Sequence, residues 1–190
     1  MIIGLTGTIA SGKGEVAEYL KKKGFSYFSL SQEVREEATK RGIEHIRENL
    51  QRLGNELRMQ QGSGILAQMV SQKIFPGMNV IVDGIRNPEE VQELKKIGHF
   101  YLIAIDAPKE DRFSRVISRN RESDPKTWPD FLKVDAIDQG FQQETSGQQV
   151  LQCIKVADYK ITNNASLGSL QDKTQYIINA VTNKELCELL

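Results

Sequence analysis

The sequence has few cysteines, no surplus of either charge and no long apolar run, and each shortage excludes a class of protein. Its 190 residues include 25 Lys and Arg, 25 Asp and Glu, and two cysteines. The balanced charge excludes a basic nucleic-acid footprint, and Cys153 and Cys187 lack metal-ligand spacing, so we expect two free thiols. Apolar runs such as residues 101–105 are too short to cross a bilayer, and residues 1–3 lack the basic segment of a signal peptide. We therefore expect a cytoplasmic protein that binds neither nucleic acid nor a membrane.

What the sequence does contain is a regular alternation of strand-like and helix-like segments. Apolar residues make up 39% and charged residues 26% of the chain, so a folded domain is expected rather than disorder. Short apolar runs alternate with segments of helical period, which is the pattern of a parallel sheet covered by helices. The predicted strands are residues 1–6, 25–29, 80–83, 100–106 and 159–162. We predict a single α/β domain over residues 1–190, a three-layer fold with a five-stranded parallel sheet.

Two regions depart from this alternation, and one helix is marked with unusual clarity. A helical stretch at about residues 30–75 is too long for a simple crossover, so we interpret it as an insertion. Residues 120–147 are irregular and rich in Asp and Gln, which indicates a lid. In between, Asn87-Pro88-Glu89-Glu90 supplies an N-cap, a first-turn proline and the glutamate of a capping box. These residues predict a helix that stops at Gly98.

The strongest motif follows the first predicted strand and reads Gly7-Thr8-Ile9-Ala10-Ser11-Gly12-Lys13. This G-x-x-x-x-G-K pattern between a strand and a helix is typical of a polyphosphate-binding loop. Small residues let backbone N–H groups turn inward, and the helix N-terminus adds partial positive charge. Lys13 adds a full charge where the β and γ phosphates meet. We therefore predict that residues 7–15, including Gly14 and Glu15, bind ATP, with Mg²⁺ as its counter-ion.

The residues at both ends of the chain resemble dephospho-coenzyme A kinases. The similarity covers Gly4-Leu5-Thr6-Gly7 through Lys13 and the segment Ala157-Asp158-Tyr159-Lys160-Ile161-Thr162-Asn163-Asn164. In that family the second segment forms the last strand and the loop beside the donor adenine, so the resemblance implies that Asn163 binds the donor. The family ends its second strand with Asp-x-Asp, one member of which can deprotonate a hydroxyl acceptor. Here the matching residues are Ser29-Leu30-Ser31, so that base is missing.

The middle of the chain resembles adenylate kinases instead. Those kinases also carry glycine directly after the loop lysine, although they usually have Thr where this chain has Glu15. Segments Ser29-Leu30-Ser31-Gln32-Glu33-Val34-Arg35 and Val80-Ile81-Val82-Asp83-Gly84-Ile85-Arg86 match the family's acceptor segments in register. The resemblance implies that Ser31, Arg35 and Arg86 bind the acceptor phosphate. It also implies that Asp83 orders Mg²⁺ through water. An acceptor phosphate needs no base, but it needs guanidinium groups to hold it.

A third group of arginines follows the fourth predicted strand. Arg112, Arg115 and Arg119 recur at helical spacing, which predicts one basic face opposite Phe113, Val116 and Ile117. In the kinases that the chain resembles, arginines at the start of the lid stabilise the transferring phosphoryl group, which implies this role for Arg115 and Arg119. The alternative is a solvated basic face. No further arginine pair follows Arg121, and the lid offers Lys133, Asp135 and Asp138 instead.

Most of the chain is similar to a looser group of archaeal and bacterial adenylate-kinase-related proteins and to kinase-like domains attached to deoxycytidylate deaminases. The resemblance rests on Gly12-Lys13-Gly14-Glu15-Val16, on Asp83-Gly84-Ile85-Arg86, and on Ala157-Asp158-Tyr159 followed by Asn163. It implies a kinase that moves the γ-phosphoryl group of ATP to a nucleoside or deoxynucleoside monophosphate. Two alternatives stay open: a dephospho-coenzyme A kinase-like activity, and a nucleotide-sensing module without turnover. The expected macromolecular partner is a second copy of the chain or a deaminase.

Overall fold

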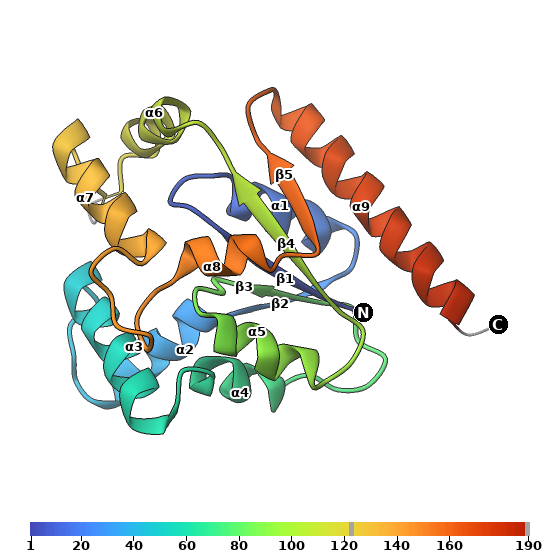
Figure 1. Ribbon diagram of the computed structural model, residues 1–190, viewed down its shortest axis with the longest axis horizontal. Helices are drawn as coiled ribbons and strands as arrows, with labels where there is room; N and C mark the ends of the chain where they lie inside the picture. Colours follow the sequence, from blue (N-terminus) through green and yellow to red (C-terminus); the bar gives the residue numbers. More distant parts are fainter. Residues whose placement is uncertain (122–123, 189–190) are drawn as a thin grey trace.

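Helices and strands alternate around one sheet in the computed structural model, which describes residues 1–121 and 124–188 (Figure 1). The strands are β1 (Ile2–Gly7), β2 (Ser26–Ser29), β3 (Val80–Asp83), β4 (Phe100–Asp106) and β5 (Tyr159–Thr162). The helices are α1 (Lys13–Lys22), α2 (Leu30–Lys40), α3 (Arg47–Gln61), α4 (Ile65–Ser71), α5 (Pro88–Lys95), α6 (Lys109–Arg119), α7 (Trp128–Gln139), α8 (Val150–Lys155) and α9 (Leu167–Glu188). None of these described helices is long and apolar enough to cross a bilayer.

The five strands are all parallel and lie in the order β2-β3-β1-β4-β5. Every residue of β1 is buried, whereas the edge strands β2 and β5 are partly exposed. A central parallel strand is covered on both faces, so its sequence reads as a continuous apolar run. The predicted three-layer α/β fold is confirmed, with small differences only at the first residues of β1 and β2 and at the last residue of β1.

Alternate side chains of the strands feed two separate apolar layers. Ile3 and Leu5 pack with α1 and α9, whereas Ile2 packs on the other face with α2, α3, α4, α5 and α8. This separation follows from the two-residue repeat of a strand, which sends successive side chains to opposite faces. Because all strands run the same way, their carboxyl ends meet at one edge, which is where open α/β sheets bind ligands.

The capping box predicted at Asn87 is present at the start of α5. The Asn87 side chain accepts a hydrogen bond from the N–H of Glu89 at 3.0 Å, and Glu90 Oε2 accepts from the N–H of Asn87 at 3.0 Å. These bonds satisfy backbone donors that the first turn of a helix cannot pair internally. The predicted stop at Gly98 also fits, since this residue follows α5 with a φ of 85°.

The two regions that the sequence set apart contain helices outside the basic strand-helix alternation. Residues 30–75 fold into α2, α3 and α4, and residues 120–147 contain α7. A third apolar cluster joins α6 and α7 to the loop after β1 through Ile9, Val116 and Phe131. The Trp128 ring packs against Phe113 with a centroid distance of 5.2 Å.

Candidate active site

The loop between β1 and α1 is shaped by two glycines that no other residue replaces without strain. Gly7 and Gly12 have φ values of 147° and 110°. A Cβ on Gly12 would lie 2.4 Å from Asn163 Nδ2, and one on Gly7 would lie 1.9 Å from the carbonyl oxygen of Ile105. α1 begins at Lys13 directly after Gly12, so the N-terminus of that helix faces the loop. The geometry is that of an anion-binding loop.

Lys13 lies inside this loop and is held by its backbone. Its Nζ donates to the carbonyl oxygens of Gly7 at 2.7 Å and Thr8 at 2.9 Å. Burial lowers the pKa of Lys13 to about 8, and the nearby carboxylate of Asp83 partly offsets that shift. Because Asp83 offsets only part of the shift, this half-buried ammonium is stabilised further when an anion arrives.

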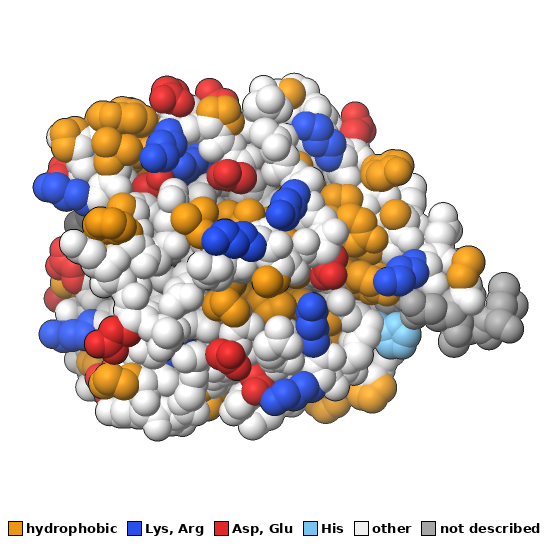
Figure 2. All heavy atoms as spheres, viewed as in Figure 1, with side chains coloured by type: hydrophobic (Ala, Val, Ile, Leu, Met, Phe, Trp, Pro, Cys, Tyr) orange, Lys and Arg blue, Asp and Glu red, His pale blue; other side chains and the backbone are white. Residues whose placement is uncertain are grey.

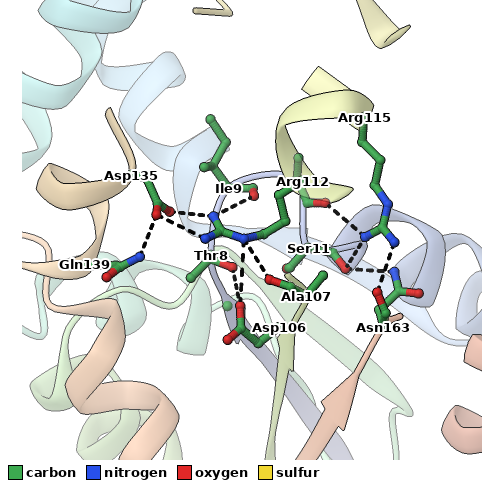
Figure 3. A network of polar contacts seen from close by, with 12 residues as sticks. Thr8, Ile9, Ser11, Asp106, Ala107, Arg112, Arg115, Asp135, Gln139 and Asn163 are labelled. Atoms are coloured by element: carbon green, nitrogen blue, oxygen red, sulfur yellow. Dashed lines mark hydrogen bonds and ion pairs between the residues drawn. The ribbon is translucent and has the colours of Figure 1, made fainter. Parts of the chain in front are cut away.

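Asn163 connects the end of β5 to the loop. Its Nδ2 donates to the carbonyl of Ser11 at 2.8 Å, and its own carbonyl accepts from Arg115 Nη2 at 2.9 Å. Arg115 also donates to the Ser11 carbonyl at 3.3 Å, as Figure 3 shows. The structure thus brings together two residues that were predicted separately, Asn163 for the donor and Arg115 for the transferring group.

A buried ion pair joins α6 to the lid helix α7, and this pair was not anticipated from the sequence. The Arg112 guanidinium donates to both carboxylate oxygens of Asp135, and each side chain is 2% exposed. Arg112 also donates to the carbonyl oxygens of Ala107 and Ile9, so it contacts the phosphate loop and the end of β4 (Figure 3). Asp106 at that strand end accepts from the Thr8 hydroxyl at 2.7 Å.

The prediction of one basic face on α6 is wrong in part. Arg112 is buried together with Val116, whereas the apolar Ile117 is 44% exposed. The reason is that α7 packs on α6 and provides Arg112 with the buried partner Asp135, so the inward side of α6 carries an arginine beside the apolar Val116. Arg115 is half-buried beside the loop, and Arg119 donates to both oxygens of Asp124 at 2.7 and 2.8 Å.

Asp83 occupies the carboxyl end of β3, next to β1. Its Oδ1 accepts from the N–H of Gly84 at 2.7 Å and its Oδ2 accepts from the Tyr27 hydroxyl at 3.0 Å. Burial and the charge of Asp83 raise the pKa of Tyr27 to about 12. The hydroxyl therefore stays protonated and donates a hydrogen bond to Asp83. Glu15, in the first turn of α1, is exposed and lines one cleft together with Asp83.

The predicted acceptor residues line the same cleft as Asp83 and Glu15. Arg35 of α2 is exposed and its Nη1 donates to the carbonyl of Ser31 at 3.4 Å. Ser31 is close to Gly84, since a Cβ on that glycine would lie 3.2 Å from Ser31 Oγ. Arg86 donates from Nη1 to Gln148 Oε1 at 3.0 Å. All three predicted acceptor residues therefore face one space.

Arg86 is positioned by a buried carboxylate. Glu90 Oε2 accepts from the Arg86 N–H at 2.8 Å, while Oε1 accepts from Arg58 of α3 at 2.8 and 2.9 Å. Glu90 is fully buried and Arg58 is 4% exposed. The sequence identifies Glu90 as a capping residue but gives no sign of its pairing with Arg58, which is 32 positions away.

One cleft of about 650 Å³ contains the predicted donor and acceptor residues together. Among the described residues that line it are eight Lys or Arg and only four Asp or Glu. On the molecular face in Figure 2, by contrast, basic and acidic side chains are interspersed, in line with the zero net charge of the chain. Positive charge is thus concentrated in the cleft, where it attracts anionic ligands.

The loop fits the phosphates of ATP on three observations. Lys13 is a half-buried cation that forms no ion pair within the described part of the chain, a helix N-terminus faces the loop, and the buried Oγ of Ser11 has no hydrogen-bond partner among the described residues. No group of three His, Cys, Asp or Glu side chains forms a metal site within residues 1–121 and 124–188. Mg²⁺ is commonly held by one or two carboxylates together with substrate phosphates, and Asp83 offers such a carboxylate.

Comparisons with known proteins agree with this geometry. Residues 3–132 match the family model described as an AAA domain. A UPF0200 protein of Pyrococcus horikoshii is 34% identical over 95% of this chain and 97% of its own length. A UPF0200 protein of Pyrococcus abyssi is 35% identical over the same shares. Shikimate kinase from Aquifex aeolicus superposes with a TM-score of 0.57 at 16% identity, covering 98% of this chain and 99% of that chain, which shows a P-loop kinase-like fold.

Proposed function

We propose that this chain, which belongs to the UPF0200 family and carries an AAA domain, is an ATP-dependent kinase that phosphorylates a nucleoside or deoxynucleoside monophosphate. The observation that carries the proposal is the single cleft that Lys13 shares with Arg35 and Arg86. Donor and acceptor phosphates bound to these residues would meet in one space. Phosphoryl transfer depends mainly on such positioning and on charge stabilisation, because the protein has little covalent chemistry to perform.

On the donor side, the loop amides of residues 7–15 and Lys13 would hold the phosphates of ATP. Mg²⁺ would neutralise part of the phosphate charge, and Asp83 would hold its water ligands. Arg115 is fixed beside the loop by the carbonyls of Ser11 and Asn163, so its guanidinium would stabilise charge on the transferring group without reorganising first. We assign Arg119 the same role, with Asp124 setting its orientation.

On the acceptor side, Ser31, Arg35 and Arg86 would bind a phosphate. The end of β2 carries Ser29 rather than a carboxylate, and the Asp83 carboxylate already accepts two hydrogen bonds. A hydroxyl acceptor that needs a base is therefore less suited to this cleft than a phosphate acceptor. Dephospho-coenzyme A is therefore the second candidate acceptor, after a monophosphate.

A nucleotide-sensing module that has lost turnover is the third candidate, and one observation favours it. Arg112 and Arg119 are each held by a carboxylate through two hydrogen bonds, so part of the arginine charge near the loop is already neutralised. Such a module would bind nucleotide tightly and pass the signal to a partner such as a deaminase.

The test is acceptor-dependent ADP release from Mg²⁺-ATP across a panel of ribo- and deoxyribonucleoside monophosphates plus dephospho-coenzyme A. Lys13→Ala should abolish release, and Lys22→Ala, an exposed lysine on the same helix, should leave it intact. Release with one monophosphate supports the proposal and identifies the acceptor. Release only with dephospho-coenzyme A supports the second candidate, and nucleotide binding without release supports the third.

A further inference from the structure

Three elements meet at an ion-pair cluster on the acceptor side of the cleft. Arg47, the first residue of α3, donates from Nη2 to the two oxygens of Asp138 at 3.2 and 3.4 Å. Arg86 Nη1 lies 3.8 Å from the same carboxylate, which belongs to the lid helix α7. All three side chains line the cleft. One carboxylate is thus shared by two guanidinium groups, one from the start of α3 and one from the loop after β3.

We infer that Arg47 and Arg86 form the binding site for a tetrahedral dianion, such as a phosphate monoester of the acceptor, and that Asp138 occupies this site until the ligand displaces it. Two guanidinium groups that converge on one point suit a phosphate better than a single carboxylate, because a phosphate has more acceptor oxygens and more charge. The inference rests on the proposed function, since the acceptor there is a monophosphate. Arg47 would then bind the acceptor phosphate together with Arg35 and Arg86.

The contacts of Asp138 differ from those of a permanent ion pair on the same helix. Asp135, three residues earlier, is bound to an arginine that is also 2% exposed. The two arginines around Asp138 are 30% and 33% exposed. Their distances to Asp138 are longer than the usual 2.7–2.9 Å or so of charge-assisted hydrogen bonds. Arg47 and Arg86 therefore remain open to a ligand, and the bonds that the ligand replaces are weak.

The guanidinium of Arg47 also has N–H donors that Asp138 does not use. Within residues 1–121 and 124–188 it makes no hydrogen bond other than those to Asp138. An arginine has five N–H donors, so a phosphate can be bound by donors that the carboxylate leaves unused. Moreover, the charges of both Arg86 and Asp138 affect the pKa of Lys13, which places the cluster within electrostatic reach of the phosphate loop.

Displacement of Asp138 would release only one of the two ion pairs that hold α7. Asp135 would keep α7 attached to Arg112, whereas the last turn of α7, which carries Asp138, would be free to move. The phosphate of an arriving acceptor would thus replace Asp138 as the partner of Arg47 and Arg86. A carboxylate in this place also selects against weakly charged ligands, which cannot compete with it.

The test uses inorganic phosphate as probe and calorimetric titration as readout. The protein is first saturated with a non-hydrolysable ATP analogue and Mg²⁺, so that the loop around Lys13 is filled. Asp138→Asn should bind phosphate about tenfold more tightly than the unmodified chain, because the competing charge is gone. The double variant Arg47→Gln/Asp138→Asn should lose that gain. Asp130→Asn, which alters an exposed carboxylate of α7, should bind phosphate as the unmodified chain does.

A second measurement needs no variant. Saturating phosphate should increase amide hydrogen exchange in the last turn of α7, residues 135–139, because Asp138 would no longer contact Arg47 and Arg86. Equal phosphate affinity in Asp138→Asn and the unmodified chain, or unchanged exchange in α7, would overturn the inference and make Asp138 a structural contact.

These readouts are independent of turnover, so failure of the kinase proposal is recognised separately. If Asp138→Asn gains affinity and loses it again with Arg47→Gln, the anion site stands, even where no acceptor yields ADP. If a monophosphate yields ADP but Asp138→Asn gains no affinity, the kinase proposal stands and the displacement by phosphate is wrong.

Discussion

Arg112 and Asp135 join the two helices beside the phosphate loop through two hydrogen bonds, and both side chains are removed from water. The ring of Phe131 lies under the guanidinium at 5.4 Å from its centroid, which adds a cation-π contact. Gln139 donates to the same carboxylate at 2.7 Å. The position of α7, and with it that of Asp138, is therefore set by a buried charge that has to stay paired.

Asp135→Asn should destabilise the protein markedly. Removing one partner of a buried pair leaves the other charge uncompensated, at a cost of about 3 kcal/mol or more. Urea unfolding should report this loss, with Trp128, the only tryptophan of the chain, as the fluorescent probe. Asp130→Asn is the matched control, because Asp130 is exposed and lies 3.6 Å from Lys133. An equal effect of the two variants would contradict the importance of the Arg112 pair.

Glu90→Gln should impair both stability and acceptor binding. The variant removes the charge that pairs with Arg58 and weakens the bond that fixes the backbone of Arg86. We expect a loss of about 3 kcal/mol in the free energy of unfolding and a higher KM for the acceptor, with little change in the KM for ATP. Denaturant titration and initial-rate kinetics test the two parts. Glu89→Gln, an exposed neighbour, serves as control, and a KM effect on ATP alone would disagree with this placement.

Gly12→Ala should weaken nucleotide binding while the chain still folds. Its φ of 110° disfavours a side chain, and the new Cβ would meet Asn163 Nδ2 at 2.4 Å. Strain of this kind costs about 1–3 kcal/mol, so the affinity for ATP should fall by about 5- to 160-fold. Fluorescence titration with a labelled nucleotide would measure it. Gly168→Ala, in a part of α9 where a Cβ meets nothing closer than 3.8 Å, should bind ATP normally.

Nucleotide binding should weaken as the pH rises above 8. Burial lowers the pKa of Lys13 to about 8 in the free protein, so the side chain is charged below that pH and increasingly neutral above it. Bound phosphates favour the charged form and raise this pKa, so binding above pH 8 has to take up a proton. Calorimetry in buffers of different ionisation enthalpy measures the uptake, and Lys13→Met should remove it. Identical heats in all buffers would refute the pKa shift.

The parts of this protein that were predictable from sequence are those encoded by neighbouring residues. The five strands, the phosphate loop and the Asn87 capping box are written within a few positions each, because turn chemistry and side-chain periodicity are local. The predicted ends of the strands therefore agree with the structure to within one residue.

The contacts that were missed connect distant positions. Arg47 and Asp138 are 91 residues apart, and neither carries a motif of its own. Arg112 was predicted to lie on a basic face of its helix. Helical period alone cannot show that Arg112 pairs with Asp135, which belongs to a neighbouring helix 23 residues later. The roles of the predicted site residues remain predictions, although the structure brings them into one cleft.

Transfer of the γ-phosphoryl group to an acceptor can be followed directly. ATP labelled with radioactive phosphorus at its γ position is incubated with Mg²⁺, the protein and the monophosphate that gave ADP release, and the products are separated by charge. We expect label in a diphosphate of the acceptor, absent with Lys13→Ala and reduced with Arg86→Gln. Label found only in inorganic phosphate, or none released while the nucleotide stays bound, would contradict it.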